Sequence, residues 1–314
     1  MRFSYFTHQR LNVGPLVNST AYVNKHSLSE NRANFHQWLV GFTDGDGSFS
    51  VVKQNNKWSL IFKIGQSTYN LRVLQFIKKQ LGAGNIYVEK NKKMADFRIR
   101  DLNTINTILI PIFEEYPLLT TKFYNYEKFK NAYVILSNST LSKIEKDKLL
   151  NELSLSIVPS DYISPAWKIV NNTVSNYETA SRIMTKGWLI GFTEAEGSFY
   201  LVNKTCTRIV HGFEITQKLD KIVLMSIKYL LHINTNVSTK KAGYFSIATT
   251  NSRAIENIIN YYHNTMKGMK SAEFKIWNRS YKKHKGDYLA LEKIRNNVRI
   301  MKNYPHVVLN KKKE

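Results

Sequence analysis

Two pairs of acidic residues recur at the same place in a repeated stretch of this sequence. Asp44 and Asp46 lie in WLVGFTDGDGSF, and Glu194 and Glu196 lie in WLIGFTEAEGSF. The two stretches are identical at eight of twelve positions and start 150 residues apart. Carboxylate oxygens are the hard ligands that Mg²⁺ prefers, and water and phosphate complete its shell. The repeated acids therefore predict a divalent-metal site to which each copy contributes.

The residues around these acids predict two helices in close contact. In residues 38–47, Trp38, Gly41, Phe42 and Gly45 share one helical face. A glycine inside a helix costs about 1 kcal/mol relative to alanine. Two glycines on one face are therefore explained best by the close approach of a second helix backbone. The predicted interface between the two halves comprises Trp38, Gly41, Gly45, Trp188, Gly191 and Ala195.

The acids fall at the carboxyl ends of these predicted helices, where the helix dipole is negative. Bringing two such ends together is electrostatically unfavourable unless a cation lies between them. A single Asp-x-Asp-Gly would be an ordinary turn at the end of a helix. Two matched copies beside a glycine-lined contact favour the metal site instead.

Each copy is followed by the same succession of predicted elements. After the first come strands at 48–54 and 58–66, a helix that ends at Gly82, a hairpin of 85–91 and 94–100 around Lys92 and Lys93, and helices at 102–116 and 120–137. The second copy repeats this order, with helices at 220–232, 251–264 and 270–285 and a hairpin around Lys241 and Ala242. The prediction is an α+β fold of two pseudo-symmetric α-β-β-α-β-β-α-α domains. Each has a four-stranded antiparallel sheet, and the two pack through the motif helices.

The predicted domain organisation follows from the repeat. The segments are an N-terminal extension at 1–34, a first domain at 35–137, a linker at 138–184 with a helical stretch at 141–153, a second domain at 185–290, and a basic tail at 291–314.

The overall charge narrows the class of partner. The chain of 314 residues has 46 Lys and Arg against 23 Asp and Glu, a formal net charge of +23. An anionic partner would relieve this repulsion, and nucleic acid is favoured over a membrane surface. The single cysteine excludes a disulfide framework and a cysteine-rich zinc module.

LVGFTDGDG (39–47) and LIGFTEAEG (189–197) resemble the LAGLIDADG motif of homing endonucleases and the related intron maturases. Two motifs in one chain resemble the single-chain class, so the resemblance implies a monomer. It implies a site-specific double-strand break in a long pseudo-palindromic DNA target by metal-dependent hydrolysis. It also implies Mg²⁺ as the cofactor, with Mn²⁺ able to substitute and Ca²⁺ supporting binding without cleavage.

The resemblance also assigns site residues by position. Asp46 and Glu196 would bind the metal and the scissile phosphate. The other catalytic positions are Gln66, Gln217, Lys122, Lys270 and Lys221. In the first copy Asn70 stands where the basic residue Lys221 stands in the second, a departure from the pattern. Asp44 and Glu194 are expected to form hydrogen bonds at the helix interface rather than to hold metal.

Strand alternation predicts which sheet face contacts DNA. The core face would carry Phe49, Val51, Phe62, Ile64, Phe97 and Ile99. The opposite face would carry Ser50, Gln54, Lys63, Glu89, Asn91, Asp96, Arg98, Arg100, Tyr200, Lys204, Glu214, Ser238, Lys240, Tyr244 and Ser246. Mixed basic, amide and acidic side chains suit the base edges of the major groove. An ordinary solvated sheet face would also be polar, so the alternative stays open for each residue.

Other functions remain compatible with this fold. An RNA maturase would assist the splicing of its own group I intron, alone or together with DNA cleavage, although acids at both 46 and 196 favour cleavage. A transcription factor is less favoured, because no separate helix-turn-helix segment is evident. Residues 1–29 contain Arg2, Arg10 and Lys25 and no acid. This composition resembles a mitochondrial transit segment, or upstream coding sequence retained in an intron reading frame, and it predicts a mitochondrial protein without a membrane partner.

Overall fold

The computed structural model describes residues 19–89, 93–240 and 243–303, with side chains from residue 30 to residue 301 of these ranges. The chain divides into two compact units, Met1–Asn34 and Phe35–Glu314, and both copies of the motif lie in the second unit. None of the described helices is both long enough and apolar enough to cross a bilayer.

The first half follows the predicted order of elements. They are α1 (Ser19–Asp46), β1 (Gly47–Gln54), β2 (Lys57–Ser67), α2 (Leu71–Leu81), β3 (Asn85–Glu89), β4 (Met94–Ile99), a helical run of α3 (Leu102–Thr104), a π-helical turn (Ile105–Leu109) and α4 (Ile110–Glu115), and then α5 (Lys122–Ser137). Gly82 ends α2 in the left-handed conformation, at φ 66°, and its N–H donates to the Lys78 carbonyl. Glycine adopts this backbone conformation without a steric penalty, which is why it ends helices.

The second half repeats the pattern. Its elements are α8 (Lys186–Glu196), β5 (Gly197–Thr205), β6 (Arg208–Gln217), α9 (Lys221–Leu230), β7 (Ser238–Thr239), β8 (Phe245–Thr249), α10 (Ser252–Tyr261) and α11 (Met269–His284). Both sheets are antiparallel, in the orders β1-β2-β4-β3 and β5-β6-β8-β7. The predicted fold class is confirmed.

Several elements differ in extent from the prediction. The first motif helix starts at Ser19, well before residue 38, and α12 (Tyr288–Asn303) occupies much of the segment predicted as a tail. The strand β7 has only two residues and pairs on one side only, with β8. An edge strand with exposed side chains on both faces gains little from burial, which explains why it is short. The predicted contact residue Asn91 lies outside the described residues.

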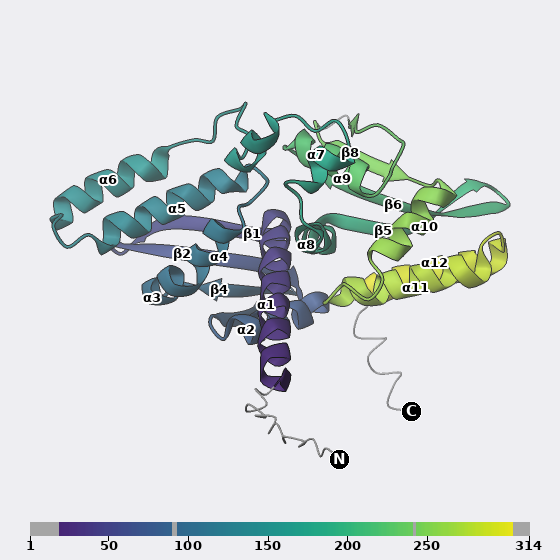
Figure 1. Ribbon diagram of the computed structural model, residues 1–314, viewed down its shortest axis with the longest axis horizontal. Helices are drawn as coiled ribbons and strands as arrows, with labels where there is room; N and C mark the ends of the chain where they lie inside the picture. Colours follow the sequence, from purple (N-terminus) through teal and green to yellow (C-terminus); the bar gives the residue numbers. More distant parts are fainter. Residues whose placement is uncertain (1–18, 90–92, 241–242, 304–314) are drawn as a thin grey trace, which may run out of the picture. The chain divides into compact units, whose positions relative to one another are not determined.

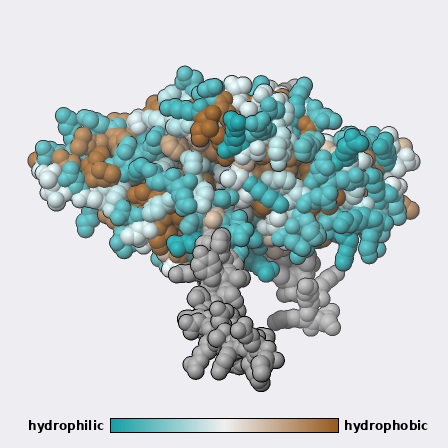
Figure 2. Space-filling model, in the orientation of Figure 1, coloured by the Kyte–Doolittle hydropathy of each residue, from teal (hydrophilic) through white to brown (hydrophobic). Residues whose placement is uncertain are grey.

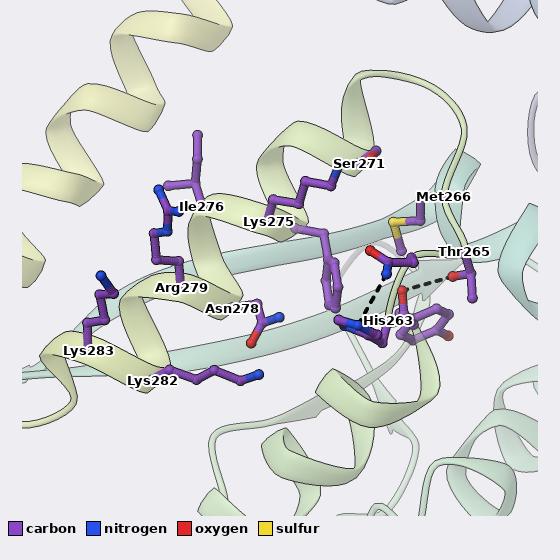
Figure 3. A pocket seen from close by; sticks show the side chains of 13 residues that line it. His263, Thr265, Met266, Ser271, Lys275, Ile276, Asn278, Arg279, Lys282 and Lys283 are labelled. Atoms are coloured by element: carbon purple, nitrogen blue, oxygen red, sulfur yellow. Dashed lines mark hydrogen bonds between the residues drawn. The ribbon is translucent and has the colours of Figure 1, made fainter.

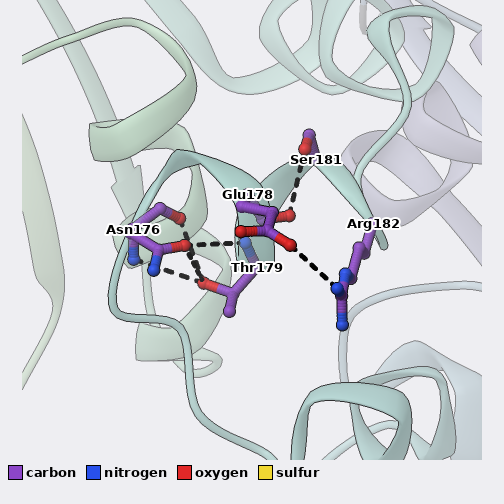
Figure 4. A network of polar contacts seen from close by, with 5 residues as sticks. All are labelled: Asn176, Glu178, Thr179, Ser181 and Arg182. Carbon is purple, nitrogen blue, oxygen red and sulfur yellow. Dashed lines mark hydrogen bonds and ion pairs between the residues drawn. The ribbon is translucent and has the colours of Figure 1, made fainter.

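The connector between the halves contains structure of its own: α6 (Lys143–Leu155), a 3₁₀-helix (Pro165–Val170) and α7 (Tyr177–Ser181). Helix α7 is the last helix before α8, and it begins with a capping box between Asn176 and Thr179 (Figure 4). The Thr179 N–H donates to Asn176 Oδ1 over 2.8 Å, and the Asn176 N–H donates to Thr179 Oγ1 over 3.2 Å. An ion pair of 2.8 Å joins Glu178, in the first turn of α7, to Arg182, which follows its last residue. The second motif helix begins a few residues later with a cap of its own, in which Thr185 Oγ1 accepts from the Trp188 N–H over 3.1 Å.

The core lies on one face of each sheet. In register, Phe49 lies opposite Phe62, which lies opposite Ile99, and all three are buried. The predicted core face is confirmed, with Val51 partly buried at its margin. Helix α5 contacts this face of the first sheet, and α11 contacts the same face of the second (Figure 1). In the second sheet, Trp277 Nε1 of α11 donates to the Tyr200 carbonyl over 3.1 Å. The first turns of α5 and α11 reach the ends of the motif helices, where Lys122 donates to the Gly45 carbonyl and Lys270 donates to the Gly197 carbonyl.

Candidate active site

The helices α1 and α8 touch through their small residues. A methyl group on Gly41 would overlap the carbonyl of Trp188, and a methyl group on Gly191 would overlap the carbonyl of Trp38. One layer further on, Gly45 lies directly against the methyl group of Ala195. Glycine is required where two backbones approach this closely. The contact brings the carboxyl ends of both motif helices to one place.

Reciprocal hydrogen bonds join the two halves beside this contact. Trp38 Nε1 donates to Glu194 Oε2 over 3.0 Å, and Trp188 Nε1 donates to Asp44 Oδ2 over 2.8 Å. Each acid also accepts backbone N–H groups from the segment before a long helix of its own half. Asp44 bonds to Leu119 N over 2.7 Å, and Glu194 bonds to Lys267 N over 2.9 Å.

These hydrogen bonds occupy the carboxylate oxygens of Asp44 and Glu194, the first acids of the two motifs. Burial raises the pKa of Asp44 to about 6, although its hydrogen bonds act in the opposite direction. Burial likewise raises the pKa of Glu194. Their side chains are occupied with protein donors, the arrangement expected for a structural role at the helix interface.

The second acids of the motifs, Asp46 and Glu196, lie close together at the ends of α1 and α8. A methyl group on Gly45 would lie 3.2 Å from Glu196 Cγ. Burial raises the pKa of Asp46. Burial also raises the pKa of Glu196, and the neighbouring charge of Asp46 raises it further. Two partly buried carboxylates that repel one another form a site with affinity for cations.

Two lysines supply positive charge at this site. Lys122 Nζ donates to the carbonyls of Thr43, over 3.3 Å, and of Gly45. Lys270 Nζ donates to the Gly197 carbonyl over 2.8 Å and lies 3.8 Å from the carboxylate of Glu273. Both ammonium groups favour the charged forms of the two acids. Burial lowers the pKa of Lys122, and the surrounding carboxylates counteract this shift.

The two glutamines predicted for the site have different partners. Gln66 Nε2 donates to Asp46 Oδ2 over 2.5 Å, and Gln66 Oε1 accepts from Asn70 Nδ2 over 2.7 Å. The side chain of Gln217 bonds to Asp220 instead. Within the described structure, Gln66 therefore orients a motif acid directly, whereas Gln217 contacts Asp220, a residue outside the repeated motifs.

Lys221 is not among the groups whose charge acts on the two motif acids, and its catalytic role stays a prediction. Its side chain is exposed at the start of α9, with Nζ 5.9 Å from the centre of the Phe245 ring. Lys122 and Lys270 are the ammonium groups that act on the two acids. The counterpart of Asn70 is Asp220, because each of these two side chains caps a helix of the opposite half. The four-residue offset from the glutamine therefore misaligned the two copies.

The donor set fits a divalent cation of the Mg²⁺ type. Among the described residues, no group of three or more His, Cys, Asp or Glu side chains has the arrangement of a metal site. Mg²⁺ needs fewer protein ligands, since it keeps several waters and is held by one or two carboxylates together with substrate phosphates. Asp46 and Glu196 supply two such carboxylates.

The predicted DNA-facing surface is only partly as expected. Lys63 lies opposite Arg98 in register, on the face away from the core. However, Asp96 is only 6% exposed, and its carboxylate pairs with Arg98 over 2.6 Å. Asp96 is therefore covered by the longer side chains beside it and is not displayed to a base.

Ser246 in the second half is buried in the same way, at 1% exposure. Its hydroxyl donates to Glu214 over 2.5 Å, and Glu214 in turn pairs with Lys240 over 3.0 Å. Both corrections have one cause: on a sheet face, long neighbouring side chains cover short ones. Two exposed residues of the same face, Asn85 and Tyr87, were missed, although they alternate with the partly buried Ile86.

Comparisons with known proteins bear on this arrangement. The sequence profile described as LAGLIDADG endonuclease matches residues 39–133 and 189–281, which covers both halves. The chain belongs to the LAGLIDADG endonuclease family. The family predicted from the two motifs is thereby confirmed.

This LAGLIDADG endonuclease is 40% identical over 288 residues to the "Probable intron-encoded endonuclease Cox1-I1b" of Schizosaccharomyces pombe, an alignment that covers 88% of the chain and 71% of that relative. It is 33% identical over 221 residues to the "Uncharacterized mitochondrial protein RF1" of Saccharomyces cerevisiae, covering 67% of the chain but only 42% of that protein.

Solved structures share the fold. The I-SmaMI LAGLIDADG homing endonuclease bound to cleaved DNA superposes with a TM-score of 0.68 at 23% identity, covering 83% of this chain and 94% of that one. The LAGLIDADG meganuclease I-AabMI bound to uncleaved DNA gives a TM-score of 0.66 at 22% identity, with coverage of 83% and 97%. The present chain therefore has the same two-domain fold as I-SmaMI and I-AabMI.

Proposed function

We propose that the protein is a homing endonuclease that makes a double-strand break in a long pseudo-palindromic DNA site. The observation that carries this proposal is the meeting of Asp46 and Glu196 between the ammonium groups of Lys122 and Lys270. Two acids at the junction of two similar halves suit a reaction on two strands related by pseudo-symmetry. The endonuclease names of the relatives and the DNA-bound structural neighbours support the same function.

The residues of the site have distinct roles in this proposal. Asp46 and Glu196 would hold Mg²⁺, or Mn²⁺ in its place, and the bound ion supplies Lewis acidity and lowers the pKa of coordinated water. Gln66 fixes the orientation of the Asp46 carboxylate. Lys122 and Lys270 stabilise the negative charge that develops on the phosphate in the transition state, because they are already positioned there.

The partner in this proposal is double-stranded DNA, bound by a monomer. One chain contributes both motif acids, so a second copy is not needed to complete the site. The net charge of +23 favours contact with the phosphate backbone, and the polar faces of the two sheets offer side chains to the base edges.

The experiment is cleavage of a supercoiled plasmid library randomised over the recognition region, with the full chain in Mg²⁺, Mn²⁺ or Ca²⁺. We expect linear product with Mg²⁺ and Mn²⁺, and a gel-shifted complex without cleavage in Ca²⁺. Asp46→Asn and Glu196→Gln should bind the selected site but not cut it, whereas the exposed acid variant Asp161→Asn should cut normally. If the wild-type protein cuts no plasmid, the endonuclease proposal is wrong; if both acid variants cut at the wild-type rate, the site assignment is wrong.

RNA binding is a second candidate function, favoured by one observation. A pocket of about 450 Å³ opens beside α11, and four basic residues line it: Lys275, Arg279, Lys282 and Lys283 (Figure 3). Its lining contains no acid. Figure 2 shows that hydrophilic residues prevail over the part of this view where α10, α11 and α12 lie in Figure 1.

This basic pocket lies on the far side of the second sheet from the proposed DNA surface, because α11 covers the core face. It could therefore bind a group I intron RNA while DNA occupies the other face, as a maturase would require. The test is a filter-binding assay with the intron RNA, with and without saturating target DNA. Lys275→Glu combined with Lys282→Glu should weaken RNA binding and leave DNA cleavage unchanged; loss of cleavage, or unchanged RNA affinity, contradicts this assignment.

A mitochondrial location is the final part of the proposal. The names of the Schizosaccharomyces pombe Cox1-I1b relative and of the Saccharomyces cerevisiae mitochondrial protein RF1 support it. The basic, acid-free composition of residues 1–29 agrees with it. Immunoblotting of purified mitochondria and of the remaining cell fractions would test it, and enrichment outside mitochondria would contradict it.

A further inference from the structure

Two buried or half-buried side chains cross from one half of the protein to the other beside the site. Asn70, which precedes α2 in the first half, accepts a hydrogen bond of 2.8 Å from the N–H of Met269, the first residue of α11 in the second half. Asp220, which precedes α9 in the second half, accepts from the N–H of Thr121 over 2.9 Å and from its hydroxyl over 3.2 Å. Thr121 immediately precedes α5 in the first half.

Each crossing bond therefore ends at the helix that carries a lysine of the site. Lys270 is the second residue of α11, and Lys122 is the first residue of α5. The first N–H groups of a helix have no partner within the helix, so an external acceptor fixes where the helix begins. Asn70 and Asp220 provide that acceptor from the opposite half.

The local geometry shows that both contacts are built into the fold. Asn70 is only 9% exposed, and a methyl group on Gly268 would collide with its Oδ1, so the chain beside α11 leaves room for this acceptor. Asp220 has a left-handed backbone at φ 61°, which is uncommon for a residue other than glycine. A fold retains such a conformation only when the surrounding structure imposes it.

The two crossing residues also connect to the rest of the site. Asn70 Nδ2 donates to Gln66, which itself donates to Asp46, so two side chains link a motif acid of the first half to α11 of the second. On the other side, Asp220 bonds to Gln217 and to the start of α5, and Lys122 reaches the Gly45 carbonyl next to Asp46.

We propose that Asn70 and Asp220 are reciprocal positioning residues: Asn70 holds the helix of Lys270, and Asp220 holds the helix of Lys122. Each lysine is thereby placed at the cleavage site by the half to which it does not belong. This inference rests on the endonuclease function proposed above. It goes further by making the two strand-cleavage events separable, since each crossing bond supports one lysine.

The test is strand-resolved, single-turnover cleavage of a duplex that the wild-type full chain cuts, with a different label on each strand. A misplacement of about 1 Å can cost about 100-fold in rate. We therefore expect Asp220→Ala to slow one strand by about 10-fold or more and the other by less than about 3-fold. Asn70→Ala should show the opposite strand preference. Asp220→Asn should restore most of the rate, because its Oδ1 still accepts from the Thr121 N–H.

Matched controls remove helix caps of the same chemistry away from the site. Asp101 accepts from the Thr104 N–H over 2.7 Å and Asn251 accepts from the Ala254 N–H over 3.2 Å, each within its own half. Asp101→Ala and Asn251→Ala should leave the ratio of the two strand rates unchanged. Equal slowing of both strands by Asp220→Ala and by Asn70→Ala, or no slowing by either, would overturn the proposal.

Amide hydrogen exchange separates a failure of this inference from a failure of the proposed function. Asp220→Ala should speed exchange in the first turn of α5 but not of α11, and Asn70→Ala should do the reverse. A wild-type protein that cuts no DNA refutes the endonuclease function, and the exchange pattern still decides whether the caps are reciprocal. Exchange that rises equally in both helices, in either variant, overturns the crossed-cap assignment.

Discussion

The contact between Gly45 and Ala195 leaves room for one methyl group between the motif helices, and this can be tested by moving that methyl group. In the structure, a β-carbon on Gly45 would overlap the β-carbon of Ala195. Gly45→Ala alone therefore forces the helices apart, and overpacking of this kind costs about 1–3 kcal/mol. The higher helix propensity of alanine returns about 1 kcal/mol. The expected net loss of unfolding free energy is therefore about 0–2 kcal/mol.

Ala195→Gly alone should cost about 2 kcal/mol, from about 1 kcal/mol of helix propensity and about 0.8 kcal/mol for the lost buried methyl group. In the double variant Gly45→Ala/Ala195→Gly, the propensity terms cancel and one methyl group again lies between the helices. We expect the double variant to fall within about 0.5 kcal/mol of the wild-type protein. The coupling energy would then be about 3 kcal/mol, which is large for a pair of small residues.

Equilibrium unfolding in urea measures these free energies, with far-UV circular dichroism as the signal. The control pairs Gly45→Ala with Ala132→Gly, a buried alanine of α5, whose effects should add. Additive losses in the Gly45/Ala195 pair, with the double variant about 3 kcal/mol below wild type, would refute the close approach of the two helices.

Three further predictions follow from the site and the sheets. Burial raises the pKa of Asp46 above its ordinary value, so the stability that this residue contributes is present at low pH and is lost as the pH rises through the folded-state pKa. In a chelator at pH 7, Asp46→Asn should therefore melt at a higher temperature than the wild-type protein. Added Mg²⁺ should raise only the wild-type melting temperature. Burial lowers the pKa of His211 from 6.5 to about 4, so the unfolded chain binds a proton that the folded chain does not. The free energy of unfolding should therefore fall as the pH drops from about 6.5 towards 4, by at most about 3 kcal/mol. His211→Gln should flatten this part of the stability profile measured in urea, and an unchanged slope would contradict the burial of His211. Arg98→Ala removes the 2.6 Å partner of the buried Asp96 carboxylate and should lower the free energy of unfolding by about 1–3 kcal/mol. Arg100→Ala should change it by less than about 0.5 kcal/mol. Equal effects of the two substitutions in a thermal or urea melt would contradict a structural role for Arg98 alone.

The sequence by itself determined the features that depend on local pattern. The helical spacing of Gly41 and Gly45 predicts a close helix contact, because only small residues at that spacing allow two backbones to touch. The alternation of Phe97 and Ile99 with polar residues predicts which face of β4 is buried, because side chains alternate across a strand. The repeat alone predicts two similar halves with an acid at the end of each motif helix.

Only the tertiary structure decided which side chains meet across the halves. The chain takes four residues from Gln66 to Asn70 but three from Gln217 to Asp220, so counting along the sequence paired Asn70 with Lys221 and missed Asp220. The exposure of a polar residue on a sheet face likewise depends on its neighbours. Asp96 is polar by type and on the predicted face, yet the side chain of Arg98 pairs with it and it is buried. Such contacts join residues that are distant along the chain or depend on the lengths of adjacent side chains, and neither is encoded in a local pattern.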